Sequence, residues 1–130
     1  MINNNKLIVF VFLASTTFFL WQHSTGLSWD FMSYVLNAKY LFSNGTYFEW
    51  YRAPLASFIL GITSVFSWKI SEYLFIIIIS VLYLYSCIKF SKKFSLEPRI
   101  FYAVSLTPFL LLYGFSVGTE LLSLSLALLF

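Results

Sequence analysis

Long stretches without a charged side chain constrain this chain more than any other feature. Residues 7–27, 53–68, 73–88 and 100–119 contain no Asp, Glu, Lys or Arg. Only 10% of all residues are charged, against about 25% in a soluble domain. A soluble single domain is therefore excluded, because the chain lacks the polar surface that a core folded in water needs. We expect an all-α polytopic membrane protein, in which lipid surrounds the apolar helices.

The first uncharged stretch, residues 7–27, is long enough to cross the hydrocarbon core of a bilayer, which takes about 20 apolar residues. A secretory signal peptide is the alternative interpretation, because Lys6 precedes the apolar residues 7–14. The apolar run continues through residues 18–21 without a small-residue cleavage site. We therefore predict an uncleaved membrane anchor.

Two amphipathic helices are predicted in the more polar region that follows. Residues 28–44 form the first, with Ser28 as the expected N-cap and Asn44-Gly45 as a stop that accepts a positive φ. Helical spacing gives this helix two faces. The apolar face contains Phe31, Val35, Ala38 and Phe42, and the polar face contains Asp30, Ser33, Tyr34 and Asn37. Residues 53–67 form the second, opened by Pro54, with a lipid-facing side at Leu55, Phe58, Ile59, Ile62 and Phe66. Such helices suit a membrane surface.

Two further spans are predicted, over residues 70–88 and 100–118. Pro108 is expected to kink the second of them, at a cost that neighbouring helices offset. Residues 120–130 are also apolar but, at 1.5 Å per residue, are too short to cross a bilayer. They are expected to begin another span, which predicts that the chain is the front of a longer protein.

Basic residues decide how these segments thread, because they concentrate on the cytoplasmic side of a membrane. Placing 53–68 on the outer surface gives a basic cytoplasmic face with Lys6, Lys89, Lys92, Lys93 and Arg99. If 53–68 instead spans and the N-terminus is inside, six basic residues lie outside, against the rule. A spanning 53–68 with the N-terminus outside also obeys the rule, but Lys6 before and Asp30 after the first span favour a cytoplasmic N-terminus. We predict a multi-pass protein of the plasma membrane with that orientation.

Four polar motifs occur in a fixed order along the chain. They are Ser28-x-Asp30-x-x-x-Tyr34, Asn44-Gly45-x-Tyr47, Glu49-x-x-Arg52-Ala53-Pro54-Leu55 and Gly118-Thr119-Glu120-Leu121-Leu122. This order resembles the GT-C superfamily of polytopic glycosyltransferases, especially the protein mannosyltransferase and aminoarabinose transferase branch. The chain departs from the family at three places. Many relatives have a second acidic residue directly after the position of Asp30, and commonly a Lys and two prolines where this chain has Arg52-Ala53-Pro54. Asp is usual where this chain has Glu120.

The resemblance implies a glycosyltransferase that moves a sugar from a polyprenyl-phosphate carrier to a protein or lipid acceptor on the extracytoplasmic face. It implies Asp30 as the catalytic base, and Arg52, Glu49, Glu120 and Tyr34 as substrate-binding residues. A guanidinium such as that of Arg52 suits phosphate because its N–H groups match the phosphate oxygens in a fork. A divalent metal cofactor stays open. An isolated 130-residue piece is expected to be inactive.

Each candidate residue also has an ordinary structural interpretation. Asp30 suits the first turn of a helix through the helix dipole, and Arg52 suits lipid headgroups. Lone His23 fits an interfacial residue better than a metal ligand, and the single Cys87 cannot form an internal disulfide. No basic stripe suggests nucleic acid as a partner. The alternative functions are therefore a non-catalytic multi-pass protein or a truncated, degenerate relative of the family, with a transporter less favoured because the charges avoid the middle of the spans.

Overall fold

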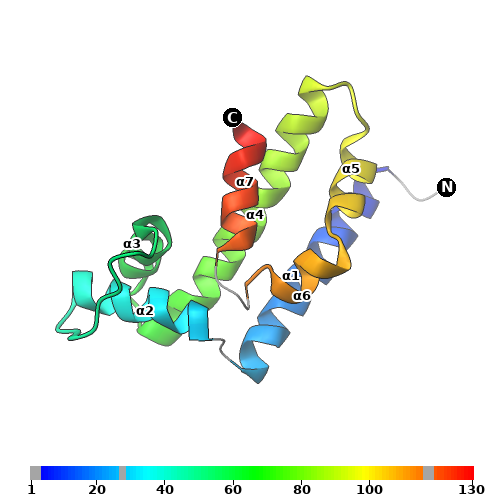
Figure 1. Ribbon diagram of the computed structural model, residues 1–130. Coiled ribbons are helices and arrows are strands. Elements are labelled where there is room, and N and C mark those ends of the chain that lie inside the picture. Colours follow the sequence, from blue (N-terminus) through cyan, green and yellow to red (C-terminus); the bar gives the residue numbers. More distant parts are fainter. Residues whose placement is uncertain (1–3, 27–28, 116–118) are drawn as a thin grey trace.

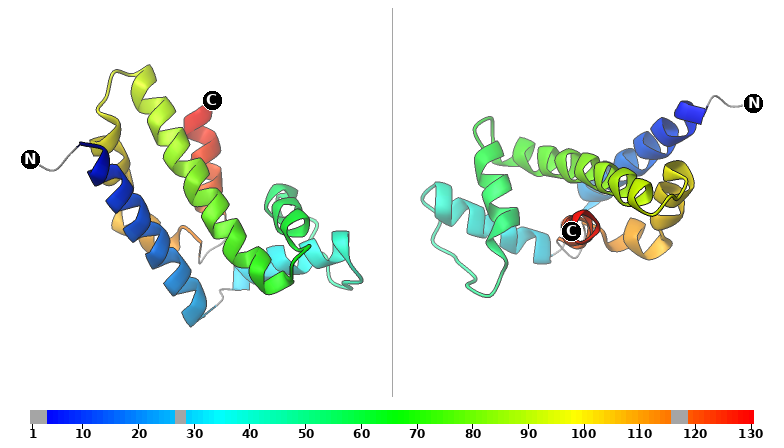
Figure 2. Two further views of the ribbon diagram at one scale, coloured as in Figure 1. Left: turned by 180° about the vertical axis from the view of Figure 1, so that it is seen from behind. Right: turned by 90° about the horizontal axis from the view of Figure 1, so that it is seen from above.

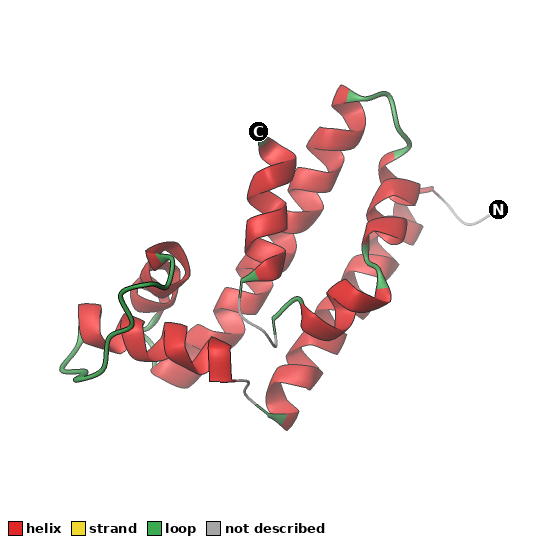
Figure 3. Cartoon of the chain, viewed as in Figure 1, coloured by secondary structure: helices red, strands yellow, loops and turns green. Residues whose placement is uncertain are grey.

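All secondary structure that the computed structural model describes is α-helical, and the description covers residues 4–26, 29–115 and 119–130. The helices are α1 (Asn4–Thr25), α2 (Trp29–Phe42), α3 (Pro54–Thr63), α4 (Trp68–Lys93), α5 (Pro98–Ser105), α6 (Pro108–Tyr113) and α7 (Glu120–Leu129), as shown in Figures 1 and 3. The all-helical class is thus confirmed for the described residues. The predicted N-cap Ser28, and Gly118 of the last motif, lie outside them.

Two helices are long and apolar enough to cross a membrane: residues Lys6–Thr25 of α1 and the whole of α4. They run in opposite directions, because His23 near the end of α1 bonds Glu72 near the start of α4. The helix α4 is longer than the predicted span 70–88. Ser67 caps its start by accepting a hydrogen bond from the Ile70 N–H at 3.1 Å, and lysines in its last turn interact favourably with the helix dipole.

The helix α4 is also the centre of the packing. It contacts α1, α3, α5 and α7, with the red C-terminal helix α7 beside it in both views of Figure 2. Its buried side chains include both large apolar groups and serines, and the small serines allow neighbouring helices to approach closely. These buried side chains are Ser71, Phe75, Ile76, Ile79, Ser80, Tyr83, Ser86, Cys87 and Ser91.

The helices α2 and α3 pack on each other at one end of this assembly (Figure 1). The predicted helix 53–67 is shorter in the structure, because α3 ends at Thr63. Ser64 caps this end: its hydroxyl and its N–H both donate to the Gly61 carbonyl, at 2.7 and 3.2 Å. Its expected lipid-facing side is exposed at Leu55, Phe58 and Ile62, and beyond the helix end at Phe66, whereas Ile59 packs against the core.

The stop of α2 occurs where it was predicted, but for a different reason. Gly45 does not have a positive φ; instead its backbone folds back against the end of the helix, with its N–H donating to the Lys39 carbonyl at 3.2 Å. A Cβ at this position would lie 2.6 Å from the Tyr40 backbone nitrogen. The chain needs glycine here because no side chain fits between the turn and the helix.

The segment predicted as one kinked span, residues 100–118, corresponds to two short helices. The helix α5 ends at Ser105, and α6 begins at Pro108 after Thr107, whose hydroxyl accepts from the Leu110 N–H at 3.2 Å. Proline has no N–H for the Val104 carbonyl four residues earlier, so a continuous helix would lose that bond. The prediction of a single kinked helix is wrong, because a proline with a capping threonine before it starts a new helix.

Candidate functional site

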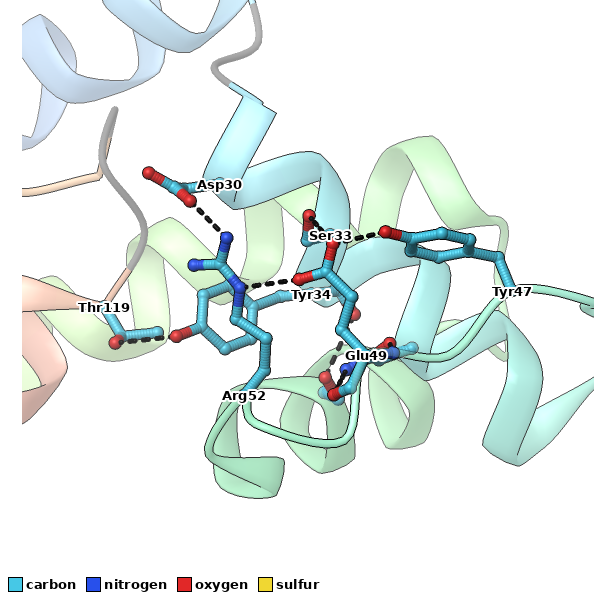
Figure 4. Close-up of polar contacts among 9 residues, drawn as sticks. Asp30, Ser33, Tyr34, Tyr47, Glu49, Arg52 and Thr119 are labelled. Carbon is cyan, nitrogen blue, oxygen red and sulfur yellow. Dashed lines mark hydrogen bonds and ion pairs between the residues drawn. The ribbon is translucent and has the colours of Figure 1, made fainter.

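Arg52 lies between two carboxylates at the edge of α2 (Figure 4). Its Nη2 donates to Oδ1 of Asp30, and its Nε donates to Oε2 of Glu49 at 2.8 Å. Its guanidinium carbon also lies over the Tyr34 ring, 5.4 Å from the ring centre. Four of the five residues implied by the family resemblance therefore meet at one place. They come from α2 and from the loop between α2 and α3, which are distinct segments of the chain.

Glu49 is the buried member of this group, with a side chain only 5% exposed. Its Oε1 accepts hydrogen bonds from the hydroxyls of Tyr47 and Ser33, the latter at 3.2 Å, and its Oε2 accepts from Arg52. The Tyr47 hydrogen bond, followed by that of Arg52, lowers the pKa of Glu49 to about 2. The same bond raises the pKa of Tyr47. Glu49 is therefore ionised at neutral pH, and its charge is fully partnered.

Asn37 fixes the backbone of the loop that carries Glu49. The Asn37 amide donates to the Glu49 carbonyl at 3.1 Å and accepts from the Glu49 N–H at 2.8 Å. Asn37 is itself buried, 2% exposed, so both bonds are shielded from water. The loop therefore covers the polar face of α2 at Asn37. The helix α3 also contacts α2 here, because the Ser57 hydroxyl of α3 donates to the Tyr34 carbonyl of α2 at 3.1 Å.

Asp30 is the exposed member of the group, with 35% of its side chain accessible. Only its Oδ1 bonds Arg52, and within the described residues no hydrogen bond is made to Oδ2. The residue lies in the first turn of α2, where the helix dipole stabilises a negative charge. Asp30 thus combines a fixed position with one carboxylate oxygen open to a further partner.

Glu120 is the implied site residue that does not join Arg52. It begins α7, and its Oε2 is buried without a hydrogen-bond partner among the described residues. The preceding residue, Thr119, makes the connection instead, because its hydroxyl lies 3.4 Å from the Tyr34 hydroxyl (Figure 4). The start of α7 therefore reaches the site through the neutral side chain of Thr119.

Sequence reasoning did not assign roles to Ser33, Asn37, Tyr47 or Thr119. Spacing could have indicated two of them, because Ser33 and Asn37 follow Asp30 at i+3 and i+7 on one helix face. Tyr47 and Thr119 stand in the motifs that carried the family resemblance, but nothing in a motif says which side chain a tyrosine or threonine contacts.

A second polar pair lies behind the site, between α1 and α4. His23 Nε2 is 3.0 Å from Glu72 Oε2, and the two side chains are 6% and 14% exposed. The imidazole packs edge-on between the rings of Phe31 and Tyr73, with centroid distances of 4.9 and 5.2 Å. In the part of the chain that the structure describes, no three His, Cys, Asp or Glu side chains are grouped to hold a metal ion. His23 therefore joins helices.

The arrangement around Arg52 can perform two chemical tasks together. A carboxylate with an open oxygen can accept a proton from a hydroxyl, and a guanidinium with five N–H groups can hold phosphate oxygens while keeping an ion pair. No protein-family model, curated protein or solved structure matches the chain. The functional assignment consequently depends on the chemistry of these residues.

Proposed function

We propose that this protein is a membrane glycosyltransferase that moves a sugar from a polyprenyl-phosphate carrier to a protein or lipid acceptor on the extracytoplasmic face. In this proposal Asp30 is the base, Arg52 binds the carrier phosphate, Glu49 and Tyr34 hold Arg52, and Glu120 contacts substrate. The partners are the carrier, the acceptor and the bilayer, without nucleic acid.

One observation carries the proposal: the open carboxylate oxygen of Asp30 lies beside a guanidinium held in place from two other sides. Glu49 fixes Arg52 through the Arg52 Nε at 2.8 Å, and the guanidinium carbon lies over the Tyr34 ring, 5.4 Å from its centre. A pair of this kind supplies the base and the phosphate-binding cation that glycosyl transfer from a lipid phosphate requires. Holding both groups before substrate arrives lowers the cost of ordering them in the transition state.

In the proposed reaction the acceptor hydroxyl gives its proton to Asp30 as its oxygen attacks the anomeric carbon of the sugar. The bond between that carbon and the phosphate oxygen breaks, and the carrier phosphate leaves with the bonding electron pair. Arg52 stabilises the growing negative charge on this phosphate. Its two carboxylate partners do not prevent this role, since a guanidinium carries five N–H groups and two of them serve the ion pairs.

The membrane placement is part of the proposal. The helices α1 and α4 cross the bilayer, while α2 and α3 lie at its outer surface, where the apolar side of α3 meets lipid. With ten residues, α3 is about 15 Å long and too short to span. This multi-pass arrangement, with a cytoplasmic N-terminus, puts Asp30 and Arg52 near the lipid headgroups. The phosphate of a membrane-anchored donor lies at the same level.

Replacing Asp30 by asparagine tests the proposal. Asn keeps the shape and suits a helix start nearly as well as Asp, but it cannot take up the acceptor proton. In membranes that contain the complete natural protein, transfer of labelled sugar from polyprenyl phosphate should fall by roughly 10² to 10⁴, the usual contribution of a positioned base.

The control is Glu97→Gln, which makes the same chemical change in an ion pair with Arg99 far from the site. This variant should keep wild-type transfer per unit of membrane protein. If Asp30→Asn retains a third or more of the wild-type turnover, Asp30 is not the base.

A non-catalytic membrane protein is the second candidate, favoured by one specific observation. The ion pairs join Arg52 to both Asp30 and Glu49, so they also tie the loop before α3 to the start of α2. If the ion pairs serve only to hold these segments together, the Asp30→Asn variant should lose stability. The wild-type protein should then show no transfer activity with any polyprenyl-phosphate sugar.

A further inference from the structure

An apolar groove lies between α1 and the break that separates α5 from α6. It has a volume of about 360 Å³ and is open to the surface of the molecule. Its wall on α1 is formed by Phe10, Val11, Ala14, Ser15 and Phe18, and its other wall by Ala103, Leu106 and Leu111. The small side chains of Ala14 and Ala103 leave the space that larger residues would fill. None of these residues belongs to the Arg52 site.

A second depression adjoins the groove at Phe10 and lies toward a positive charge. Phe10 also lines this second apolar depression, together with Val9, Leu13 and Lys6. The residues Val9, Phe10 and Leu13 are 53%, 69% and 57% exposed, so this face of the helix has no covering side chains. Lys6 is the only charged residue that lines either depression.

The length of this path matches one leaflet of a bilayer. From Lys6 to Phe18 the helix advances 12 residues, or about 18 Å at 1.5 Å per residue. Half of the hydrocarbon core is about 15 Å thick. An acyl chain whose headgroup is near Lys6 would therefore reach the groove between α1 and the α5–α6 break.

The charge at this end of the molecule is positive. Lys89, Lys92 and Lys93 lie in the last turns of α4, which runs antiparallel to α1, and Arg99 lies in the first turn of α5. Glu97, paired with Arg99 through the guanidinium Nε, is the one acidic residue nearby in sequence. A cationic surface at the end of the molecule where α1 begins favours an anionic lipid over a neutral one.

From this combination we infer a binding site for an anionic phospholipid, with the phosphate at Lys6 and one acyl chain in the groove between α1 and the α5–α6 break. The inference uses the part of the proposed function that places α1 across the bilayer. It does not depend on glycosyl transfer.

Native mass spectrometry of the purified protein tests the site, using phosphatidylglycerol and phosphatidylcholine with identical acyl chains as probes. We expect the wild-type protein to retain phosphatidylglycerol preferentially. Lys6→Gln should weaken this binding by about fivefold, because a basic residue near an anionic lipid surface contributes about 1 kcal/mol. Lys69→Gln, at the opposite end of the spanning helices, should leave it unchanged.

A second pair of variants tests the acyl-chain groove. Ala103→Phe should fill it and reduce binding of both lipids, whereas Ala127→Phe, at an exposed position of α7, should not. Ala14→Phe fills the groove from its other wall and replaces Ala103→Phe if that variant loses its helical circular dichroism. Equal retention of the two lipids by the wild-type protein, or unchanged binding in both groove variants, would overturn the inference. Neither result bears on sugar transfer, which uses none of these residues.

Discussion

At the residue scale, the two carboxylates around Arg52 differ in their surroundings. Glu49 is buried and accepts hydrogen bonds from three side chains, whereas Asp30 is 35% exposed and bonded through one oxygen. Saturating a carboxylate with donors makes it a fixed anion, and leaving one oxygen open keeps it available to a hydroxyl. Within the proposed function, this difference makes Glu49 the residue that positions Arg52 and Asp30 the residue that contacts substrate.

Substitution of Arg52 tests its proposed contact with the carrier phosphate. Arg52→Ala should weaken use of the polyprenyl-phosphate donor by roughly 1.5 to 3 kcal/mol, the contribution of a hydrogen bond to a charged group. Arg52→Lys should recover only part of this loss, because lysine keeps the charge but not the fork that bridges Asp30 and Glu49. The measurement is the dependence of transfer rate on donor concentration. An unchanged dependence in a stably expressed Arg52→Ala protein would assign this residue to loop packing or lipid headgroups.

Glu49 should make the stability of the protein depend on pH in acid. In the folded protein its pKa is about 2, against an ordinary value of 4.5 in an unfolded chain. Between these values only the unfolded chain binds the proton, so the stability from Glu49 is complete above 4.5 and is lost as the pH falls toward 2. The difference in unfolding temperature between wild type and Glu49→Gln should therefore be largest near neutral pH and smaller at about pH 3.

The matched control for this pH series is Glu97→Gln. Arg99 lowers the pKa of Glu97 as well, but the Glu97 side chain is 43% exposed and solvent screens the pair. Its unfolding temperature should follow that of the wild-type protein at every pH. A temperature difference for Glu49→Gln that stays constant with pH would contradict the assignment of an ionised, fully bonded Glu49.

At the element scale, the contact between α2 and α3 depends on a glycine. A Cβ on Gly61 would lie 2.1 Å from Cδ2 of Phe42, whose ring also packs edge-on against Phe58 with a centroid distance of 5.7 Å. The close approach matters for the site because α3 follows the loop that carries Arg52. The helix pair therefore positions the loop as well as the apolar surface.

Gly61→Ala should lower the free energy of unfolding by about 1 to 3 kcal/mol, because the added methyl group overpacks the contact. Combining it with Phe42→Ala removes the obstructing ring, so the double variant should be more stable than the sum of the two single effects predicts. Thermal unfolding of the purified proteins in detergent measures both. Gly26→Ala is the control, since no atom of the described residues lies within 4 Å of a Cβ there. Strict additivity would show that the Phe42 ring simply moves aside.

At the scale of the whole molecule, the proposed threading places the loop after α2 outside the cell and the turn after α4 in the cytoplasm. With Cys87 changed to Ser, a cysteine at Asn44 should react with an impermeant thiol reagent in whole cells, and one at Phe94 should not. Both positions are exposed, so both should react in permeabilised cells. Reversed labelling in whole cells would contradict the cytoplasmic N-terminus and the outer position of the Arg52 site.

The sequence alone determined the helical class, the two long apolar helices and the residue types of the site. In uncharged runs of this length, a helix satisfies the backbone N–H and C=O groups with hydrogen bonds inside the segment, without water. The periodicity of residues 28–44 also placed Phe31, Val35, Ala38 and Phe42 on an apolar face and Asp30, Ser33, Tyr34 and Asn37 on another. The first three apolar residues are buried in the structure, whereas Phe42, at the end of the helix, is 42% exposed. These features are local, because each depends on spacing along one segment.

Only the tertiary structure decided what the polar groups contact. Arg52 is 22 positions from Asp30 in the chain, and Thr119 is 85 positions from Tyr34, so no local pattern encodes either pair. The same holds for the loop that covers the polar face of α2 through Asn37, for the Gly61 contact and for the division of the 100–118 segment into two helices. Burial and hydrogen bonding in each case depend on which segments meet in space. That choice is made by packing of the whole chain, since spacing along one helix does not specify the partner across from it.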